Sequence, residues 1–183
     1  MSGPTEWEDI PSLPDSEPQK KWHLDRYEWA AECIRTAADV RIANAACGSN
    51  YGTPILRAKA PLATIIGLDR SQLALAISDA RDYGLSKLVA DLEAETLDGF
   101  RSLVSLETLE HLKDPWGWLS RLDLDVEEMV LSCPVTPTKH FNEFHLHDVS
   151  AAEFIERVAG LGWSIVAAKR QAEYVPDSVL LLH

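Results

Sequence analysis

The chain has 183 residues, 46% hydrophobic and 25% charged, which is typical of a globular domain with a buried core. Its formal net charge of −12 opposes broad contact with nucleic-acid phosphates, which bind clustered Lys and Arg. The three cysteines lack CxxC spacing, and we find neither a secretion signal nor an apolar run of membrane-spanning length. We therefore expect a cytoplasmic protein without a nucleic-acid or membrane partner.

The first segment, residues 1–21, combines prolines with Glu, Asp and Ser. This composition buries too little apolar surface to fold, so we expect a disordered acidic leader and one domain over residues 22–183. From Trp22 to about Ala38, apolar residues recur at helical spacing, which predicts a helix before the first strand. Its apolar positions are Tyr27, Ala30, Ala31, Ile34 and Ala38.

Seven short runs that favour extended backbone predict strands. They are Val40–Ala46, Ala63–Leu68, Leu88–Ala90, Leu103–Leu106, Glu128–Ser132, Ser164–Ala168 and Ser178–Leu182. Helical patterns separate most of them, which predicts an α/β fold with a seven-stranded, Rossmann-like, mostly parallel sheet and helices on both faces. The link between the last two runs is short, so we expect a C-terminal antiparallel hairpin.

Helix-start signals lie between these runs. They are Thr53 as N-cap before Pro54, a helix from Ser71 to about Tyr83 ending at Gly84, Asp114 before Pro115, and the capping box of Ser150 and Glu153. Each signal falls where a parallel sheet needs a crossover helix, so the two patterns support the same fold.

Small residues crowd the turn after the first strand, from Ala45 to Gly52. Such residues let the backbone approach a ligand closely where a helix begins, and Asp69, after the second strand, can accept hydrogen bonds from a ribose diol. This arrangement predicts a pocket for an adenosine-bearing cofactor. Asp69 has a second interpretation as the cap of the helix that begins near Ser71.

Four segments together resemble class I S-adenosylmethionine (SAM)-dependent methyltransferases of the small-molecule type. They are Ile42–Thr53, similar to the glycine-rich first motif; Ile65–Arg81, with the ribose-binding acid; Val89–Glu95, with the adenine-edge positions; and Ser105–Pro115, with the E-x-x-E-H-L turn beside the sulfonium. The helix His23–Ile34 is similar to the segment that these enzymes fold over the methionine end of the cofactor. The resemblance implies SAM as cofactor and methyl transfer to a small-molecule acceptor.

The resemblance also implies a set of site residues. The cofactor contacts would be Tyr27, Asn44, Ala46, Gly48, Asn50, Asp69, Arg70, Asp91, Leu92 and Leu106. The acceptor contacts would be Glu110, His140, Phe144 and His145. For catalysis we expect His111 and Glu107, with His111 as a general base because an imidazole pKa lies near neutrality.

Two positions depart from the family pattern. Asn44 stands where these enzymes usually have an acid, and Asn50 stands where they usually have a glycine. Asn is the residue other than glycine that best tolerates left-handed backbone, so the turn remains feasible. A catalytically weak or inactive binding or regulatory protein is therefore an alternative.

Other functions fit the sequence less well. A nicotinamide-dependent oxidoreductase would need the G-x-G-x-x-G spacing, which is missing. A nucleic-acid methyltransferase conflicts with the acidic charge and with the missing Asn/Asp-Pro-Pro-aromatic signature. The histidine-rich segment from His140 to Asp148 matches no metal motif, so we expect a substrate-facing loop and no metal site.

Overall fold

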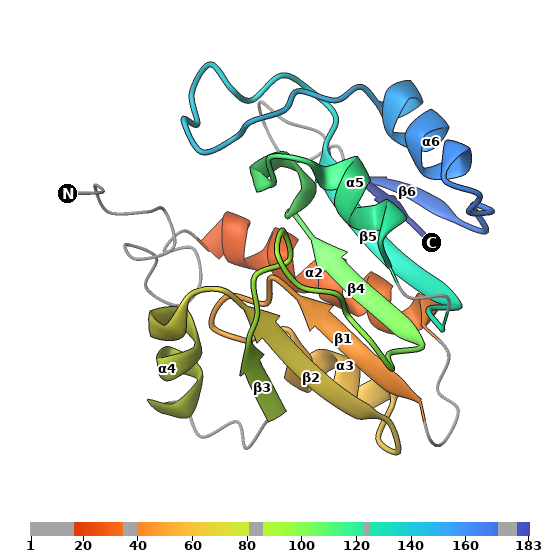
Figure 1. Ribbon diagram of the computed structural model, residues 1–183. Coiled ribbons are helices and arrows are strands. Elements are labelled where there is room, and N and C mark those ends of the chain that lie inside the picture. Colours follow the sequence, from red (N-terminus) through yellow and green to blue (C-terminus); the bar gives the residue numbers. More distant parts are fainter. Residues whose placement is uncertain (1–16, 35–39, 81–85, 123–124, 172–178) are drawn as a thin grey trace.

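The computed structural model describes residues 17–34, 40–80, 86–122, 125–171 and 179–183. Its strands join in one sheet in the order β3-β2-β1-β4-β5-β7-β6 (Figure 1). They span Arg41–Ala45 (β1), Thr64–Asp69 (β2), Ser86–Val89 (β3), Ser102–Leu106 (β4), Glu128–Pro134 (β5), Ala168–Gln171 (β6) and Val179–Leu182 (β7). Strands β1 to β5 pair in parallel, and β7 runs antiparallel to both β5 and β6. The expected α/β fold with a mostly parallel sheet is confirmed.

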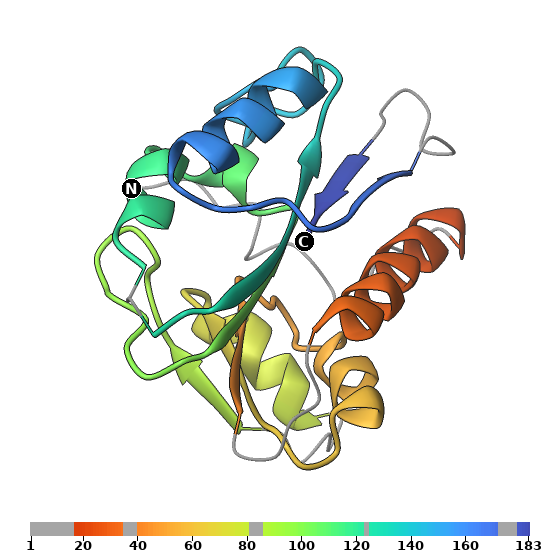
Figure 2. The ribbon, with the colours of Figure 1, turned by 90° about the vertical axis from the view of Figure 1, so that its right-hand side faces the viewer.

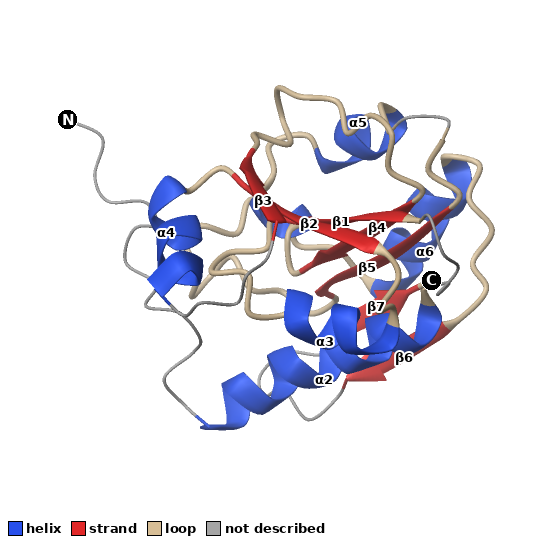
Figure 3. Ribbon diagram, turned by 90° about the horizontal axis from the view of Figure 1, so that it is seen from below, coloured by secondary structure: helices blue, strands red, loops and turns tan. Residues whose placement is uncertain are grey.

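Helices cover the sheet from two sides (Figures 2 and 3). The helical segments are α2 (Glu17–Cys33), α3 (Thr53–Lys59), α4 (Gln72–Ala80), the 3-10 turn η1 (Leu109–His111), α5 (Pro115–Ser120) and α6 (Ala151–Gly160). Helices α2 and α3 pack on one face through Tyr27, Ile34 and Leu56. Helices α5 and α6 pack on the other through Trp118 and Phe154. No described helix is both long and apolar enough to cross a membrane.

The alternation of side chains along β1 decides which layer each residue meets. Ile42 belongs to the core beneath α2 and α3, whereas Ala43 and Ala45 belong to the core beneath α5 and α6. Asn44 lies two residues after Ile42 and is fully buried. It therefore faces α2 and α3 rather than the end of the strand.

Several expected boundaries were wrong, and three of them affect the interpretation. Helix α2 begins at Glu17, so residues 17–21 are helical rather than part of a disordered leader. Helix α3 has Gly52 as its N-cap, and glycine has no side chain to make a capping hydrogen bond. Thr53, the expected N-cap, is inside the helix, and its hydroxyl bonds to Asn44 and Asn50. Strand β6 begins at Ala168, where pairing with Leu182 begins, so residues 164–167 precede the strand that we placed there.

Some expectations fall on residues outside the described ranges. These are the leader through residue 16, Ala38, the helix end at Gly84, and the link 172–178 between β6 and β7. The antiparallel pairing of β6 with β7 is nevertheless described directly, from Ala168 opposite Leu182 to Gln171 opposite Val179. The edge of the sheet beyond β5 is therefore antiparallel.

Phe154 provides a test of the layer formed by α6. Its side chain is 0% exposed and lies against Trp116, with ring centroids 6.3 Å apart. We expect Phe154→Ala to lower the free energy of unfolding by about 3–5 kcal/mol, because it removes buried apolar contacts and leaves a cavity. Urea denaturation followed by circular dichroism measures this change. The neighbouring Ile155 is 40% exposed, so Ile155→Ala should cost less than about 1 kcal/mol; equal losses would contradict the packing.

Candidate functional site

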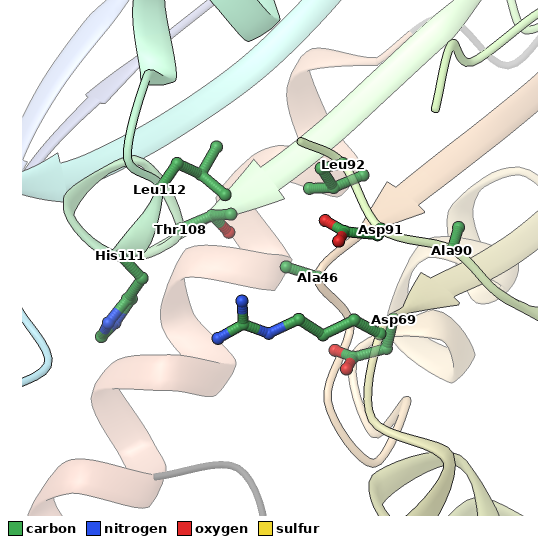
Figure 4. Close-up of a pocket in the computed structure, with 9 residues that line it drawn as sticks. Ala46, Asp69, Ala90, Asp91, Leu92, Thr108, His111 and Leu112 are labelled. Carbon is green, nitrogen blue, oxygen red and sulfur yellow. The ribbon is translucent and has the colours of Figure 1, made fainter. Parts of the chain in front are cut away.

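A narrow pocket of about 30 Å³ lies where β1, β2, β3 and β4 end (Figure 4). Ligands bind in this position in open parallel sheets. In Figure 4, Asp69 and Asp91 lie on one side of the pocket, and Thr108, His111 and Leu112 lie on the other. The lining residues are Ala46, Asp69, Arg70, Ala90, Asp91, Leu92, Thr108, His111 and Leu112.

The Asp69 carboxylate connects the ends of two neighbouring strands. Its Oδ2 accepts a hydrogen bond from the Gly48 amide at 2.7 Å, and its Oδ1 accepts one from the Ser71 amide at 2.8 Å. Burial raises the pKa of Asp69, and the two amide hydrogen bonds oppose that rise. Asp69 lines the pocket, and its remaining lone pairs can accept hydrogen bonds from a ligand, so the ribose contact stays a prediction. The alternative interpretation as helix cap was wrong, because the Ser71 hydroxyl caps α4 by accepting from the Ala74 amide at 3.1 Å.

The backbone at the rim of the pocket is strained at two points. Ala46 follows β1 with a φ of 54°, and Glu107 follows β4 with a φ of 53°. Left-handed conformations in residues other than glycine cost of order 1–3 kcal/mol and cluster at functional sites. Gly48, with a φ of +56°, borders open space, since an added Cβ would meet no atom within 4 Å. A ligand can therefore approach the backbone here.

Three residues expected to touch the cofactor are instead joined in a buried network below the glycine-rich turn. The Tyr27 hydroxyl donates to Asn44 Oδ1 at 3.1 Å, Asn44 Nδ2 donates to Thr53 Oγ1 at 3.0 Å, and that hydroxyl donates to Asn50 Oδ1. None of the three lines the pocket. Asn44 faces α2 and α3, and the hydrogen bonds hold Tyr27 and Asn50 on the same side of the sheet. Asn50 has a φ of 60°, which confirms the expected tolerance of left-handed backbone.

The positions after β4 are divided between core and pocket. Leu106 packs partly buried against the core under α2 and α3. Glu107 accepts a hydrogen bond from the Ser132 hydroxyl at 2.8 Å, and its other oxygen lies 3.5 Å from the guanidinium of the buried Arg26. The expected catalytic carboxylate is therefore held against α2 and does not line the pocket.

His111 lines both the pocket and a second cavity of about 190 Å³. The second cavity is lined by Arg70, Glu93, His111, Lys113, Glu143, Phe144 and Leu146. Burial, reinforced by the neighbouring His145, lowers the pKa of His111 to about 4. The expectation of a pKa near neutrality was wrong, because the loop after β5 covers this ring. His111 is uncharged at neutral pH and is a weak base.

The expected acceptor residues are separated in space. Phe144 lines the second cavity, and the His145 ring lies edge-on to the His111 ring with centroids 4.7 Å apart. Glu110 is buried, with Oε1 3.9 Å from His111 Nε2. His140 is exposed and lies against the ring of Phe141, so it lies outside this group.

Several lining residues were missed by the sequence analysis. Ala90, Thr108 and Leu112 line the first pocket. Each follows the end of β3 or β4 within a few residues, and that position was the available signal. Glu93 and Lys113 line the second cavity and were also missed. They come from separate loops, so no sequence pattern indicated that they would meet.

Comparisons with known proteins define the class of fold. No model of a known protein family and no curated protein sequence matches the chain. Among solved structures, the magnesium protoporphyrin IX methyltransferase of Synechocystis PCC 6803 with bound SAM matches 97% of this chain and 87% of its own, at 16% identity and a TM-score of 0.69. A SAM-dependent methyltransferase from Mesorhizobium loti matches 85% of this chain and 96% of its own, at 16% identity and a TM-score of 0.66.

A third similar structure shows how far the fold extends in function. The [4+2]-cyclase SpnF matches 86% of this chain at 16% identity and a TM-score of 0.66, and this chain spans 65% of its length. The protein therefore has the class I SAM-dependent methyltransferase fold. A fold by itself does not fix a reaction, so the reaction must be argued from the site.

His23 on α2 provides a test of how α2 covers the glycine-rich turn. Its Nδ1 lies 3.0 Å from the Tyr51 hydroxyl, and burial together with Arg26 lowers its pKa to about 3 from 6.5. Below pH 6.5 the His23 ring is protonated in the unfolded chain but stays neutral in the folded chain. Its contribution to the free energy of unfolding is therefore complete above pH 6.5 and is lost as the pH falls toward 3. One such histidine contributes a slope of at most about 1.4 kcal/mol per pH unit.

We therefore expect His23→Gln to flatten the fall of the free energy of unfolding between pH 6.5 and 4.5. Urea denaturation at several pH values measures the slope. His140→Gln, at an exposed histidine, is the matched control and should leave the slope unchanged. Equal slopes for wild type and His23→Gln would show that the His23 ring is not buried between α2 and the glycine-rich turn.

Proposed function

We propose that the protein binds SAM in the pocket at the ends of β1 to β4 and transfers its methyl group to a small-molecule acceptor held in the second cavity. The observation that carries this proposal is the Asp69 carboxylate, which lines the pocket while bonded to the Gly48 amide. A carboxylate on one strand end beside a glycine on the next is the arrangement that binds a nucleoside. The 16%-identical methyltransferase with bound SAM supports the same cofactor.

The residues present suit an adenosine group. Asp69 would accept hydrogen bonds from the ribose hydroxyls, and the open space beside Gly48 would admit the rest of the cofactor. Leu92 and Leu112 line the pocket with apolar surface that suits the faces of an adenine ring. The Asp91 carboxylate accepts a hydrogen bond from the Glu93 amide at 3.0 Å, which fixes its position for a contact at the edge of the base.

The second cavity suits the acceptor because it adjoins the first at His111 and Arg70. Phe144 and Leu146 give it an apolar side, while Arg70, Lys113 and Glu143 give it charges of both signs. Such a cavity fits a small molecule that is partly apolar and carries polar groups. It offers no uniformly basic wall for a nucleic acid.

Methyl transfer from SAM mainly requires the protein to position the acceptor and the cofactor. When bound, SAM supplies a methyl group on a positively charged sulfur. The protein aligns the acceptor with that methyl group and excludes water, and such alignment can supply a large part of the rate enhancement. His111 is neutral at physiological pH and can accept a hydrogen bond from an acceptor hydroxyl through Nε2, since its Nδ1 donates to the Phe144 carbonyl oxygen at 3.2 Å.

A second candidate function is cofactor binding with weak or no catalysis. Two observations favour it. Asn44, at the position of the usual acid, is committed to Tyr27 and Thr53, and the low pKa of His111 makes it a poor proton acceptor. Under this alternative the protein would bind SAM and act through its bound conformation rather than through turnover.

Calorimetric titration with S-adenosylhomocysteine tests the cofactor pocket. We expect Asp69→Asn to raise the Kd by about 10- to 100-fold, since hydrogen bonds to a charged group contribute about 1.5–3 kcal/mol. Asp98→Asn makes the same charge change at an exposed site and should leave the Kd unchanged. Titration with NAD serves as the control ligand and should give no heat of binding.

Equal affinities for wild type and Asp69→Asn would remove the basis of the pocket assignment. Circular dichroism of both variants separates a lost contact from lost structure. Binding of NAD in preference to S-adenosylhomocysteine would favour an oxidoreductase.

Release of S-adenosylhomocysteine during incubation with SAM and a panel of phenols, carboxylic acids and amines distinguishes the two candidate functions. An active enzyme should release it only with an acceptor present. His111→Ala should lower kcat by about 10-fold or more if His111 contacts the acceptor. Cofactor binding without release on any acceptor class would favour the second candidate.

A further inference from the structure

Three potential metal ligands meet around His111, which lines both cavities. Glu110 and His111 come from η1, and His145 comes from the loop between β5 and α6. Each offers one ligand atom, and these atoms all lie within 4.8 Å of one another. The sequence analysis expected no metal site because the spacing from His140 to Asp148 matches no metal motif, and it did not consider Glu110 and His111 together with His145.

Backbone contacts hold this cluster together independently of the three side chains. The Leu146 amide donates to the Glu110 carbonyl oxygen at 2.7 Å, and the His147 ring lies 2.8 Å from the Leu112 carbonyl oxygen. The Asp148 carboxylate accepts from the Thr138 and Lys139 amides at 2.7 and 3.1 Å. The loop is thereby fixed against η1, so the approach of His145 to His111 is built into the fold.

Each of the two imidazoles has a hydrogen-bond partner at Nδ1. A carbonyl oxygen can only accept, so His111 Nδ1 carries the proton shared with Phe144, and Nε2 keeps its lone pair. His145 Nδ1 lies 2.5 Å from the buried Thr138 hydroxyl, so this ring also has a partner that fixes its orientation. Histidine ligands usually have such a partner on the other ring nitrogen, which fixes the ring and its tautomer.

Burial also suits metal binding. Glu110 is 3% exposed, and a cation beside a buried carboxylate lowers the cost of keeping its charge out of water. Two imidazoles with one carboxylate form the ligand set of Zn²⁺ and of ferrous sites with open positions.

We propose that Glu110, His111 and His145 bind a divalent transition-metal ion of the zinc or ferrous type. Ligand atoms around zinc, at about 2.0–2.2 Å from the ion, lie about 3.4 Å apart. The most distant ligand atoms must therefore approach each other by up to about 1.4 Å when the ion binds. The ion would lie beside the second cavity, with its open positions available to an oxygen atom of a ligand.

This inference goes beyond the proposed function and does not require it. If both hold, His111 is a ligand rather than a hydrogen-bond acceptor for the substrate. The metal then lowers the pKa of a coordinated hydroxyl, a task for which the imidazole alone is poorly suited. The second cavity would accordingly favour acceptors with a coordinating oxygen.

The test is calorimetric titration of untagged, EDTA-treated protein with Zn²⁺, supported by metal analysis after dialysis. We expect one ion per chain, and Glu110→Gln and His145→Ala should each weaken binding by about 10-fold or more. His140→Ala is the matched control, because this exposed histidine lies five residues from His145 and outside the cluster. It should bind zinc as wild type does.

Absence of saturable 1:1 binding, wild-type affinity in both Glu110→Gln and His145→Ala, or an equal loss in His140→Ala would overturn the proposal. Circular dichroism checks that the variants fold, and Thr138→Val provides a milder variant that removes only the partner of His145; it should weaken zinc binding without loss of the fold. Titration of the same samples with S-adenosylhomocysteine reports on the cofactor pocket separately, so failure of either assignment is recognised independently.

Discussion

The hydrogen bonds from the Gly48 and Ser71 amides to the Asp69 carboxylate are the interaction on which the rest of the site depends. They bring the turn after β1 and the turn after β2 to one negatively charged group, so the pocket has a fixed floor before any ligand binds. The sheet pairing sets the distance between the two strand ends, and this carboxylate connects the two turns that follow them. The cost is its burial, which is visible in the raised pKa of Asp69.

The sheet separates structural from ligand-facing residues. On the α2 side, Tyr27, Asn44 and Thr53 bond to one another and stabilise the glycine-rich turn from below. At the strand ends, Asp69 and His111 remain on the pocket wall. Asn44 and Asn50, which depart from the methyltransferase pattern, therefore lie in the layer on the α2 side of the sheet, which we call the supporting layer. The pocket wall keeps Asp69, which the proposed cofactor requires.

The order of elements and the position of Asp69 could be predicted from the sequence because both follow from local patterns. Alternation of apolar runs with helical patterns predicts a parallel sheet, and an acid after its second strand must lie at the ligand-binding edge. Alternation along β1 would also have placed Asn44 beside Ile42 on the α2 face. The environment of His111 could not be predicted, because its burial depends on Phe144 and His145, more than 30 residues later in the chain.

Two glycines show how closely the residues of the supporting layer pack. A Cβ at Gly52 would collide with the Tyr27 ring, and a Cβ at Gly67 would lie 2.5 Å from Asn50 Oδ1. Each glycine is therefore matched to one bulky partner from a distant segment. Over evolutionary time the members of each pair should change together: a larger residue at position 52 or 67 becomes acceptable once position 27 or 50 has become smaller.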